Sequence, residues 1–133
     1  MAKIRHIAYR ADDVEAMASF FVQGLGMTIV QRRGNGGVDL SDGSINLTIL
    51  PAGRPKADGQ MPKRGIDHIG FAVADQDETC RLLEKAGGRK LDANEVSKSA
   101  HYEVKFHGPE GIGIDVGHWV GAAPIDAAEK KGA

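Results

Sequence analysis

The sequence lacks the features that mark several large classes of protein. Its 133 residues contain a single cysteine, Cys80, so the chain cannot form an internal disulfide. No apolar run approaches the roughly 20 residues that cross a bilayer as a helix, and the first residues lack the apolar stretch of a secretion signal. We therefore expect a cytoplasmic protein that has no membrane partner.

An excess of charge of one sign is missing as well. The 17 basic and 18 acidic residues leave a formal net charge of -1, so the chain lacks the basic footprint of a nucleic-acid-binding protein. Aromatic residues make up only 5% of the chain while glycine occurs 18 times, a balance that favours tight turns over a large aromatic core. A small molecule is the expected partner, bound by a single domain.

What the chain does contain is a repeat. Residues 4–9, around His6, return 62 positions later as residues 66–71, around His68 (from 6 to 68). Each segment alternates polar and apolar residues as a strand does, and each leads into an acidic stretch with the spacing of a helix capping box. Two helices are predicted to begin there and to end at glycines near residues 24–26 and 87–88. The first helix carries an apolar stripe that we expect in the core: Met17, Phe20 and Phe21.

Short strand-like segments follow each helix, at residues 27–31, 37–40 and 44–50, and again at 89–91, 102–106 and 112–116. The order strand, helix, strand, strand, strand therefore occurs twice. We predict an α+β fold in which two βαβββ modules form one eight-stranded curved mixed sheet around a cavity, with the helices on the outside. The predicted divisions are a first module at 1–51, a linker at 52–64, a second module at 65–119 and a polar C-terminal tail at 120–133.

Alternation of side chains along the strands places three potential metal ligands on the open face of this sheet. His6, His68 and Asp115 share that face with glycines and alanines, which leave the volume that a ligand cavity needs. Two imidazoles and a carboxylate suit Fe, Mn, Ni, Co or Zn and leave coordination positions open for substrate. The alternative is a cavity in which the histidines only hydrogen-bond a ligand or each other.

The order of several short segments resembles a known family. Residues 6–8, 20–27, 67–73 and 108–111 are similar to recurring landmarks of the vicinal oxygen chelate superfamily of glyoxalases, bleomycin resistance proteins and extradiol dioxygenases. The resemblance covers about residues 3–119. It implies metal ligands on the first, fourth, fifth and eighth strands, which correspond here to His6, a fourth-strand position, His68 and Asp115. It also implies a homodimer.

The fourth strand departs from that pattern. Its cavity-facing residues include Asn46 and Thr48, and Thr48 matches the position of the usual glutamate. In glyoxalase I and methylmalonyl-CoA epimerase the resemblance implies a carboxylate there, so its loss argues against both activities. Asp115 is also one methylene shorter than the glutamate that is common on the eighth strand.

Other candidates surround this constellation. Glu103 is the candidate catalytic residue, as a general base, with a surface salt bridge as its alternative role. His101 and Arg10 are candidates for the substrate cavity together with Asn46 and Thr48. For Arg10 the simpler interpretation is a solvated strand end, and for Asp67 a polar group that faces solvent or a dimer partner.

Three functions are compatible with this pattern. The first is a metal-dependent lyase or isomerase that acts on a small oxygen-bearing substrate chelated to the metal. The second is an extradiol-type ring-cleaving dioxygenase, which needs Fe(II) or Mn(II). The third is a non-catalytic drug-binding protein of the resistance type, for which the paired histidines are not needed.

Overall fold

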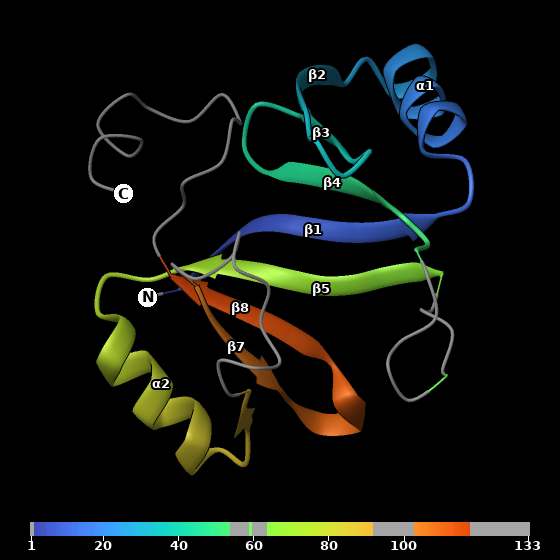
Figure 1. The fold of residues 1–133 in the computed structure, drawn as a ribbon. Coiled ribbons are helices and arrows are strands. Elements are labelled where there is room, and N and C mark those ends of the chain that lie inside the picture. Colours follow the sequence, from blue (N-terminus) through green and yellow to red (C-terminus); the bar gives the residue numbers. More distant parts are fainter. Residues whose placement is uncertain (1, 54–58, 60–63, 92–102, 118–133) are drawn as a thin grey trace.

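The computed structural model describes residues 2–53, 59, 64–91 and 103–117 (Figure 1). In these ranges the elements are β1 (Lys3–Ala11), α1 (Val14–Leu25), β2 (Thr28–Arg32), β3 (Val38–Ser41), β4 (Asn46–Pro51), β5 (Gly65–Ala72), α2 (Gln76–Lys85), β6 (Arg89–Lys90), β7 (Val104–His107), a 3-10 helix (Pro109–Gly111) and β8 (Gly113–Gly117). The predicted α+β class and the order of elements are confirmed. Most of the predicted linker 52–64 and the whole tail 120–133 lie outside the described residues.

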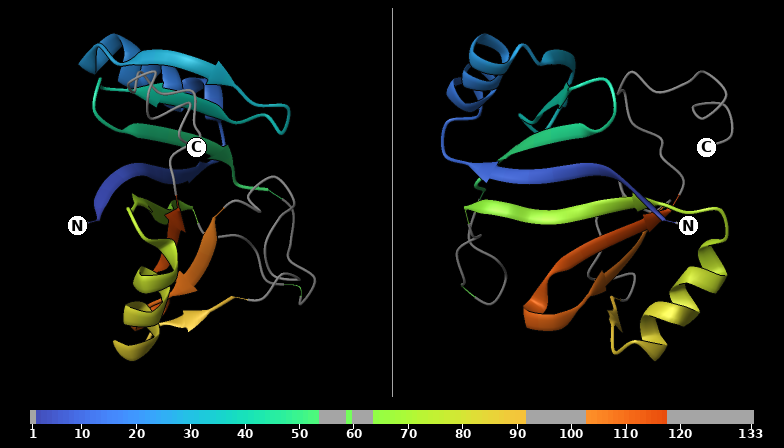
Figure 2. Two further views of the ribbon diagram at one scale, coloured as in Figure 1. Left: turned by 90° about the vertical axis from the view of Figure 1, so that its left-hand side faces the viewer. Right: turned by 180° about the vertical axis from the view of Figure 1, so that it is seen from behind.

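All eight of these strands join in one curved sheet, in the order β2-β3-β4-β1-β5-β8-β7-β6 (Figure 2). Strand β1 runs parallel to β4, and β5 runs parallel to β8. The first strands of the two repeats, β1 and β5, pair antiparallel at the centre of the sheet. Residues far apart in the sequence therefore meet on the central strands.

The helices begin and end where local chemistry dictates. The Asp13 side chain accepts a hydrogen bond from the Ala16 backbone at 2.9 Å, and Asp75 accepts one from Glu78 at 3.0 Å, so each aspartate caps the first turn of its helix. Helix α1 ends at Gly26, whose φ of 68° places it in the left-handed region that favours glycine. The two helices lie at opposite ends of the sheet (Figure 1).

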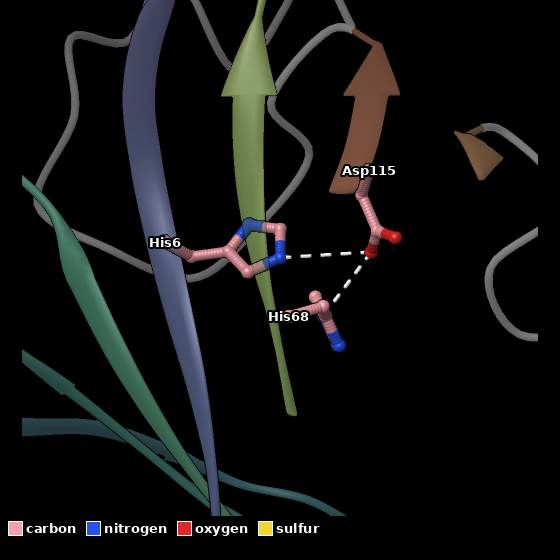
Figure 3. Close-up of side chains that lie close together, drawn as sticks. All are labelled: His6, His68 and Asp115. Carbon is pink, nitrogen blue, oxygen red and sulfur yellow. Dashed lines mark ion pairs between the residues drawn. The ribbon is translucent and has the colours of Figure 1, made fainter. Parts of the chain in front are cut away.

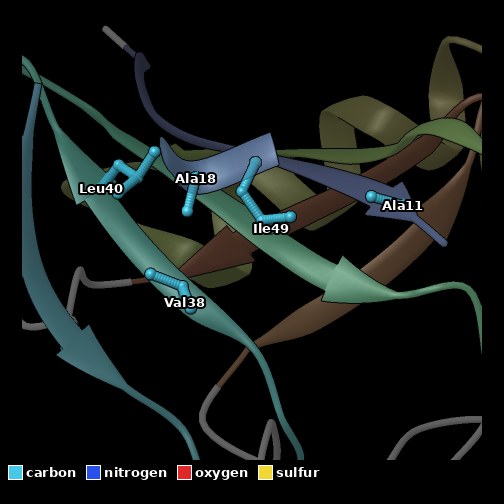
Figure 4. Close-up of a cluster of buried hydrophobic side chains, with 5 residues drawn as sticks. All are labelled: Ala11, Ala18, Val38, Leu40 and Ile49. Carbon is cyan, nitrogen blue, oxygen red and sulfur yellow. The ribbon is translucent and has the colours of Figure 1, made fainter. Parts of the chain in front are cut away.

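The main apolar cluster lies between α1 and the strands of the first repeat (Figure 4). It consists of Ala11, Ala18, Val38, Leu40 and Ile49. Each buried valine, leucine or isoleucine contributes roughly 1.5 to 3 kcal/mol.

The prediction that Phe20 belongs to this core is wrong. Phe20 is 66% exposed, although Met17 and Phe21 pack against the cluster as expected. The buried side of α1 is centred on Ala18, and Phe20 lies two positions further along, about 200° around the helix axis.

Within the described ranges, no helix is long and apolar enough to span a membrane.

Candidate metal centre

The strand register gives two rows of side chains on the face of the sheet that was predicted to line a cavity, called the cavity face below. In one row, Asn46 on β4 is opposite His6 on β1, which is opposite Gly70 on β5, and Gly70 is opposite Asp115 on β8. Directly opposed residues on paired strands share a face. In the next row, Thr48, Ala8, His68 and Gly113 follow one another across the same four strands.

The three predicted ligand side chains converge on these central strands (Figure 3). One ligand atom from each of His6, His68 and Asp115 lies within 4.8 Å of the others. Asp115 Oδ2 is 3.1 Å from His68 Nε2 and 3.7 Å from His6 Nε2. His6 and Asp115 are buried, and His68 is half-buried. Burial lowers the pKa of His6, which favours the neutral imidazole that can donate a lone pair.

Two glycines make room for the imidazoles. A Cβ placed on Gly70 would lie 1.9 Å from Cε1 of His6, so the His6 ring lies across the position that a side chain would fill. A Cβ on Gly113 would lie 3.1 Å from the Cβ of His68. The convergence of the two rings therefore depends on residue 70 being glycine.

A β-bulge orients the second histidine. The pairing of β5 with β1 skips Asp67, because Ala8 is opposite His68 while Tyr9 is opposite Ile66. The extra residue brings the Asp67 carboxylate to 2.7 Å from Nδ1 of His68. Nδ1–H donating to Asp67 leaves the Nε2 lone pair directed towards Asp115.

Arg10 binds the other oxygen of the Asp67 carboxylate. Its Nε donates to Asp67 Oδ1 at 3.0 Å, and its NH1 donates to the carbonyl of Pro51 at 2.9 Å. The hydrogen bond from His68, despite opposing desolvation, and the Arg10 guanidinium hold the pKa of Asp67 well below its usual range. Asp67 is exposed, as its interpretation as a solvent-facing polar group requires, but it is also ion-paired with Arg10 and in contact with His68, which the sequence did not indicate.

Lys105 and Glu103 complete the surroundings of Asp115. Lys105 Nζ donates to Asp115 Oδ2 at 2.6 Å and lies 3.8 Å from Glu103 Oε2. Burial, together with a hydrogen bond to Asp115, raises the pKa of Glu103 to about 8. Burial also opposes ionisation of Asp115, but the nearby His6 ring, the hydrogen bond from Glu103 and the nearby positive charges outweigh it and hold the pKa of Asp115 below its usual range. At neutral pH Glu103 is therefore protonated and Asp115 is ionised.

The first repeat presents a different polar group on the same face. Asp39 on β3 is 0% exposed, and its carboxylate accepts hydrogen bonds from Thr48 at 2.6 Å, Gln31 at 2.8 Å and Arg33 at 2.9 Å. Thr48 is thus buried beside a carboxylate on the neighbouring strand. Asn46 is also fully buried, and its amide has no hydrogen-bond partner among the described residues.

The structure thus brings His6, His68 and Asp115 together with Glu103, and it places Asn46 and Thr48 in the same rows. Arg10 lies behind His68, and His101 lies outside the described residues. Sequence reasoning missed the roles of Asp39, Asp67 and Lys105. A signal existed for Asp39, a lone acid between Val38 and Leu40, since strand alternation alone sends it to the cavity face.

The donor set fits a divalent ion by its chemistry and spacing. Ligand atoms held at about 2.1 Å from one ion lie roughly 3 to 3.5 Å apart, and both contacts to Asp115 Oδ2 are close to that range. With Nδ1–H of His68 bound to Asp67, two acceptor atoms face each other across 3.1 Å, an arrangement that a cation stabilises. Lys105 supplies one positive charge to that oxygen.

A hollow elsewhere on the described part of the chain carries less chemistry. It has a volume of about 410 Å³ and lies between α1 and the end of β1, where Phe20 and the Arg64–Asp12 ion pair line it. Both side chains of that ion pair are more than half exposed. We therefore place the functional site at the histidines.

A comparison with curated protein sequences found no match. Solved structures share the fold. Methylmalonyl-CoA epimerase from Mycobacterium tuberculosis is 18% identical, with 94% of this chain and 89% of that chain covered and a TM-score of 0.62. A variant of the Streptomyces coelicolor methylmalonyl-CoA epimerase in complex with 2-nitronate-propionyl-CoA is 19% identical, with 86% and 94% covered and a TM-score of 0.61.

A third similar structure is the 2,3-dioxygenase LapB from Pseudomonas sp. KL28. It is 21% identical with a TM-score of 0.62, and the match covers 86% of this chain but 39% of the dioxygenase chain. A family model named Glyoxalase/Bleomycin resistance protein/Dioxygenase superfamily matches residues 3–116. The match spans every described strand and both helices except Gly117, the last residue of β8, and so the chain belongs to the Glyoxalase/Bleomycin resistance protein/Dioxygenase superfamily.

Proposed function

We propose that this protein is a metal-dependent lyase or isomerase that moves a proton on a small oxygen-bearing substrate. The observation that carries the proposal is the convergence of His6, His68 and Asp115 within 4.8 Å, beside the Lys105 ammonium and the Glu103 carboxyl group. A divalent Fe, Mn, Ni, Co or Zn ion held by these residues would polarise a carbonyl oxygen of the substrate.

The other residues have roles that follow from their contacts. Asp67 holds the ring of His68 through Nδ1, and Arg10 holds Asp67. In its ionised form, which its pKa of about 8 makes the minor form at neutral pH, Glu103 accepts the substrate proton on a carboxylate oxygen and returns it, as the general base of the reaction. Lys105 offsets negative charge that develops beside Asp115.

Two structural neighbours are methylmalonyl-CoA epimerases, and their fold is the fold of this chain. Thr48 stands here where the family resemblance implies a fourth-strand carboxylate, and the nearby Asp39 carboxylate already accepts three hydrogen-bond donors. We therefore carry over the class of reaction, proton transfer next to a carbonyl, without the substrate.

Metal uptake tests the first half of the proposal. Protein purified without a nickel column is stripped with a chelator, loaded with Mn, Fe, Ni, Co or Zn, and analysed by mass spectrometry for bound metal. We expect one ion per chain, lost in His6→Ala and in His68→Ala but kept in His107→Ala, which changes an exposed histidine on β7. Wild-type protein that takes up none of these ions would shift the assignment to a non-catalytic small-molecule binder.

Hydrogen exchange tests the second half. Metal-loaded protein in D₂O is mixed with a panel of small carbonyl compounds and thioesters that includes methylmalonyl-CoA, and loss of the proton next to the carbonyl is followed by NMR. We expect exchange with at least one class of compound. Glu103→Gln should abolish exchange and leave metal content unchanged, and full exchange in that variant would remove Glu103 from its role.

A ring-cleaving dioxygenase is the second candidate, because two histidines and one carboxylate are the ligand set of many non-haem Fe(II) oxygenases. Oxygen uptake by the Fe(II)-loaded protein with catechols separates the two. Ring cleavage with no hydrogen exchange would replace the first proposal.

The proposed assembly is a homodimer. Ile4 on β1 and Ile66 on β5 are 47% and 60% exposed at the central seam, and β2 and β6 are open edge strands. Size-exclusion chromatography with light scattering is expected to give twice the chain mass at micromolar concentration. A monomer under these conditions would contradict the proposal.

A further inference from the structure

Arg33 is fixed at the start of the β2–β3 hairpin by a buried carboxylate. Its Nε donates to both oxygens of Asp39, at 3.2 Å and 2.9 Å. Asp39 is 0% exposed and is itself held by Thr48 and Gln31. A guanidinium anchored in this way loses little conformational freedom when it binds a further group.

The terminal nitrogens of Arg33 remain available. Neither donates a hydrogen bond within the part of the chain that the structure describes, and the side chain is 34% exposed. Its partner Asp39 is opposite Thr48 and accepts a hydrogen bond from it, so the guanidinium lies beside the face of the sheet that carries Thr48.

Asn46 provides an independent sign of a ligand on the same half of the cavity. It is 0% exposed, yet neither its amide nitrogen nor its amide oxygen finds a hydrogen-bond partner among the described residues. A buried amide left unsatisfied costs about 1 to 3 kcal/mol. It shares the cavity face of β4 with Thr48 and lies directly opposite His6 in the β1–β4 register.

We propose that Arg33 and Asn46 form a recognition subsite of the substrate, with Arg33 binding a carboxylate group and Asn46 a polar group nearer His6. The inference rests on the proposed function, because it takes the chelating oxygens of the same substrate to lie at His6, His68 and Asp115. The substrate is then a small acid that carries a carboxylate distant from its chelating end. Planar guanidinium donors match a carboxylate in a bidentate manner.

Two probes that differ only in the distal carboxylate test this subsite. Isothermal titration of Mn²⁺-loaded protein compares 2-oxoglutarate with 2-oxopentanoate. We expect wild type to bind 2-oxoglutarate about tenfold more tightly, in line with a hydrogen-bonded charge pair. Arg33→Met should remove that preference, whereas Arg32→Met, which changes a neighbouring arginine paired with Glu15 outside the cavity, should keep it.

Asn46→Leu distinguishes ligand binding from a structural role. Because the amide makes no hydrogen bond with the described residues, the substitution should preserve or raise the melting temperature while it weakens 2-oxoglutarate binding several-fold. A lowered melting temperature with unchanged binding would make Asn46 structural and overturn its part of the inference.

The outcomes separate this inference from the proposed function. A wild type that binds Mn²⁺ but shows no preference for 2-oxoglutarate, or an Arg33→Met variant that keeps the preference, overturns the subsite and leaves the metal centre standing. Absence of Mn²⁺ uptake overturns the metal centre instead. Glutarate titrated into metal-free protein then tests the subsite alone, with about tenfold weaker binding in Arg33→Met as the expected result and equal binding as the contrary one.

Discussion

Each repeat has a buried carboxylate in a cross-strand pair of polar residues, but the two carboxylates have different surroundings. In the first repeat Asp39 on β3 is opposite Thr48 on β4, and in the second Lys105 on β7 is opposite Asp115 on β8. The first carboxylate is saturated by neutral and cationic donors and sealed from solvent. The second lies one strand nearer the centre, where both histidines reach it.

This difference suggests a structural role for the carboxylate of the first repeat and a cation-binding role for that of the second. A buried carboxylate with all its hydrogen bonds made stabilises the chain and orients its neighbours, and it has little capacity left for a cation. A carboxylate that shares one oxygen among His68, His6 and Lys105 can exchange one positively charged partner for another. Substitutions that affect the two halves differently test this division.

The largest expected effects come from neutralising each of the two aspartates in turn. Asp115→Asn should weaken Mn²⁺ binding about 100-fold, because a ligand charge is removed, whereas Asp39→Asn should change it less than about twofold. The reverse holds for stability, since Asp39→Asn disturbs the three hydrogen-bond partners of a buried carboxylate and should lower the free energy of unfolding by about 2 to 3 kcal/mol. Titration calorimetry and urea unfolding measure the two effects. Equal loss of metal in both variants would erase the distinction.

Gly70→Ala changes the geometry of the candidate metal centre without substituting one of its three proposed ligands. Its Cβ would occupy the place of the His6 ring, so we expect the ring to be displaced and Mn²⁺ affinity to fall about 30-fold or more. The matching position of the first repeat is already Ala8. Gly24→Ala is the control, because nothing lies within 4 Å of its added Cβ. Unchanged affinity in Gly70→Ala would show that the site does not need His6 in this orientation.

Asp67→Asn sharpens the comparison further, because the β1–β5 pairing also skips a residue on β1, and that residue is Arg5, which offers no carboxylate to a histidine. Loss of the carboxylate behind His68 should weaken Mn²⁺ binding about tenfold, as for other residues that orient a metal-binding histidine. Asp12→Asn, which removes an exposed acid paired with Arg64, serves as the control. Affinity equal to wild type would reduce Asp67 to a strand-end ion pair.

The smallest effect is expected for Lys105→Met, and it has the opposite sign. The ammonium group competes with a metal ion for Asp115 Oδ2, so its removal should tighten Mn²⁺ binding by about fivefold. The same titration measures it, with Lys3→Met as an exposed control on β1. Weaker binding would mean that Lys105 holds Asp115 in place for the metal.

The sequence was sufficient for the fold and for the central side chains because both follow from regular periodicity. The repeat paired β1 with β5, and alternation with period two put His6, His68 and Asp115 on one face. Their role in binding a metal remains a prediction.

The rest depended on irregular geometry. The Asp67 contact arises at a bulge, where alternation fails, and no residue type announces a bulge there. The exposure of Phe20 depends on how α1 is rotated against β3 and β4, which a stripe of three apolar residues does not fix. The hydrogen bond from Lys105 to Asp115 needed the cross-strand register, which short strands separated by loops leave open.

The packing of His6 over Gly70 also places a constraint on the history of the sequence. A lineage that carried any larger residue at position 70 could not have accommodated the imidazole in its present place, so the glycine had to come before the histidine could act there. A larger residue at position 70 is likewise excluded for as long as the His6 ring keeps this place. The two sites, 64 positions apart in the chain (from 6 to 70), are therefore expected to change in a fixed order among related proteins.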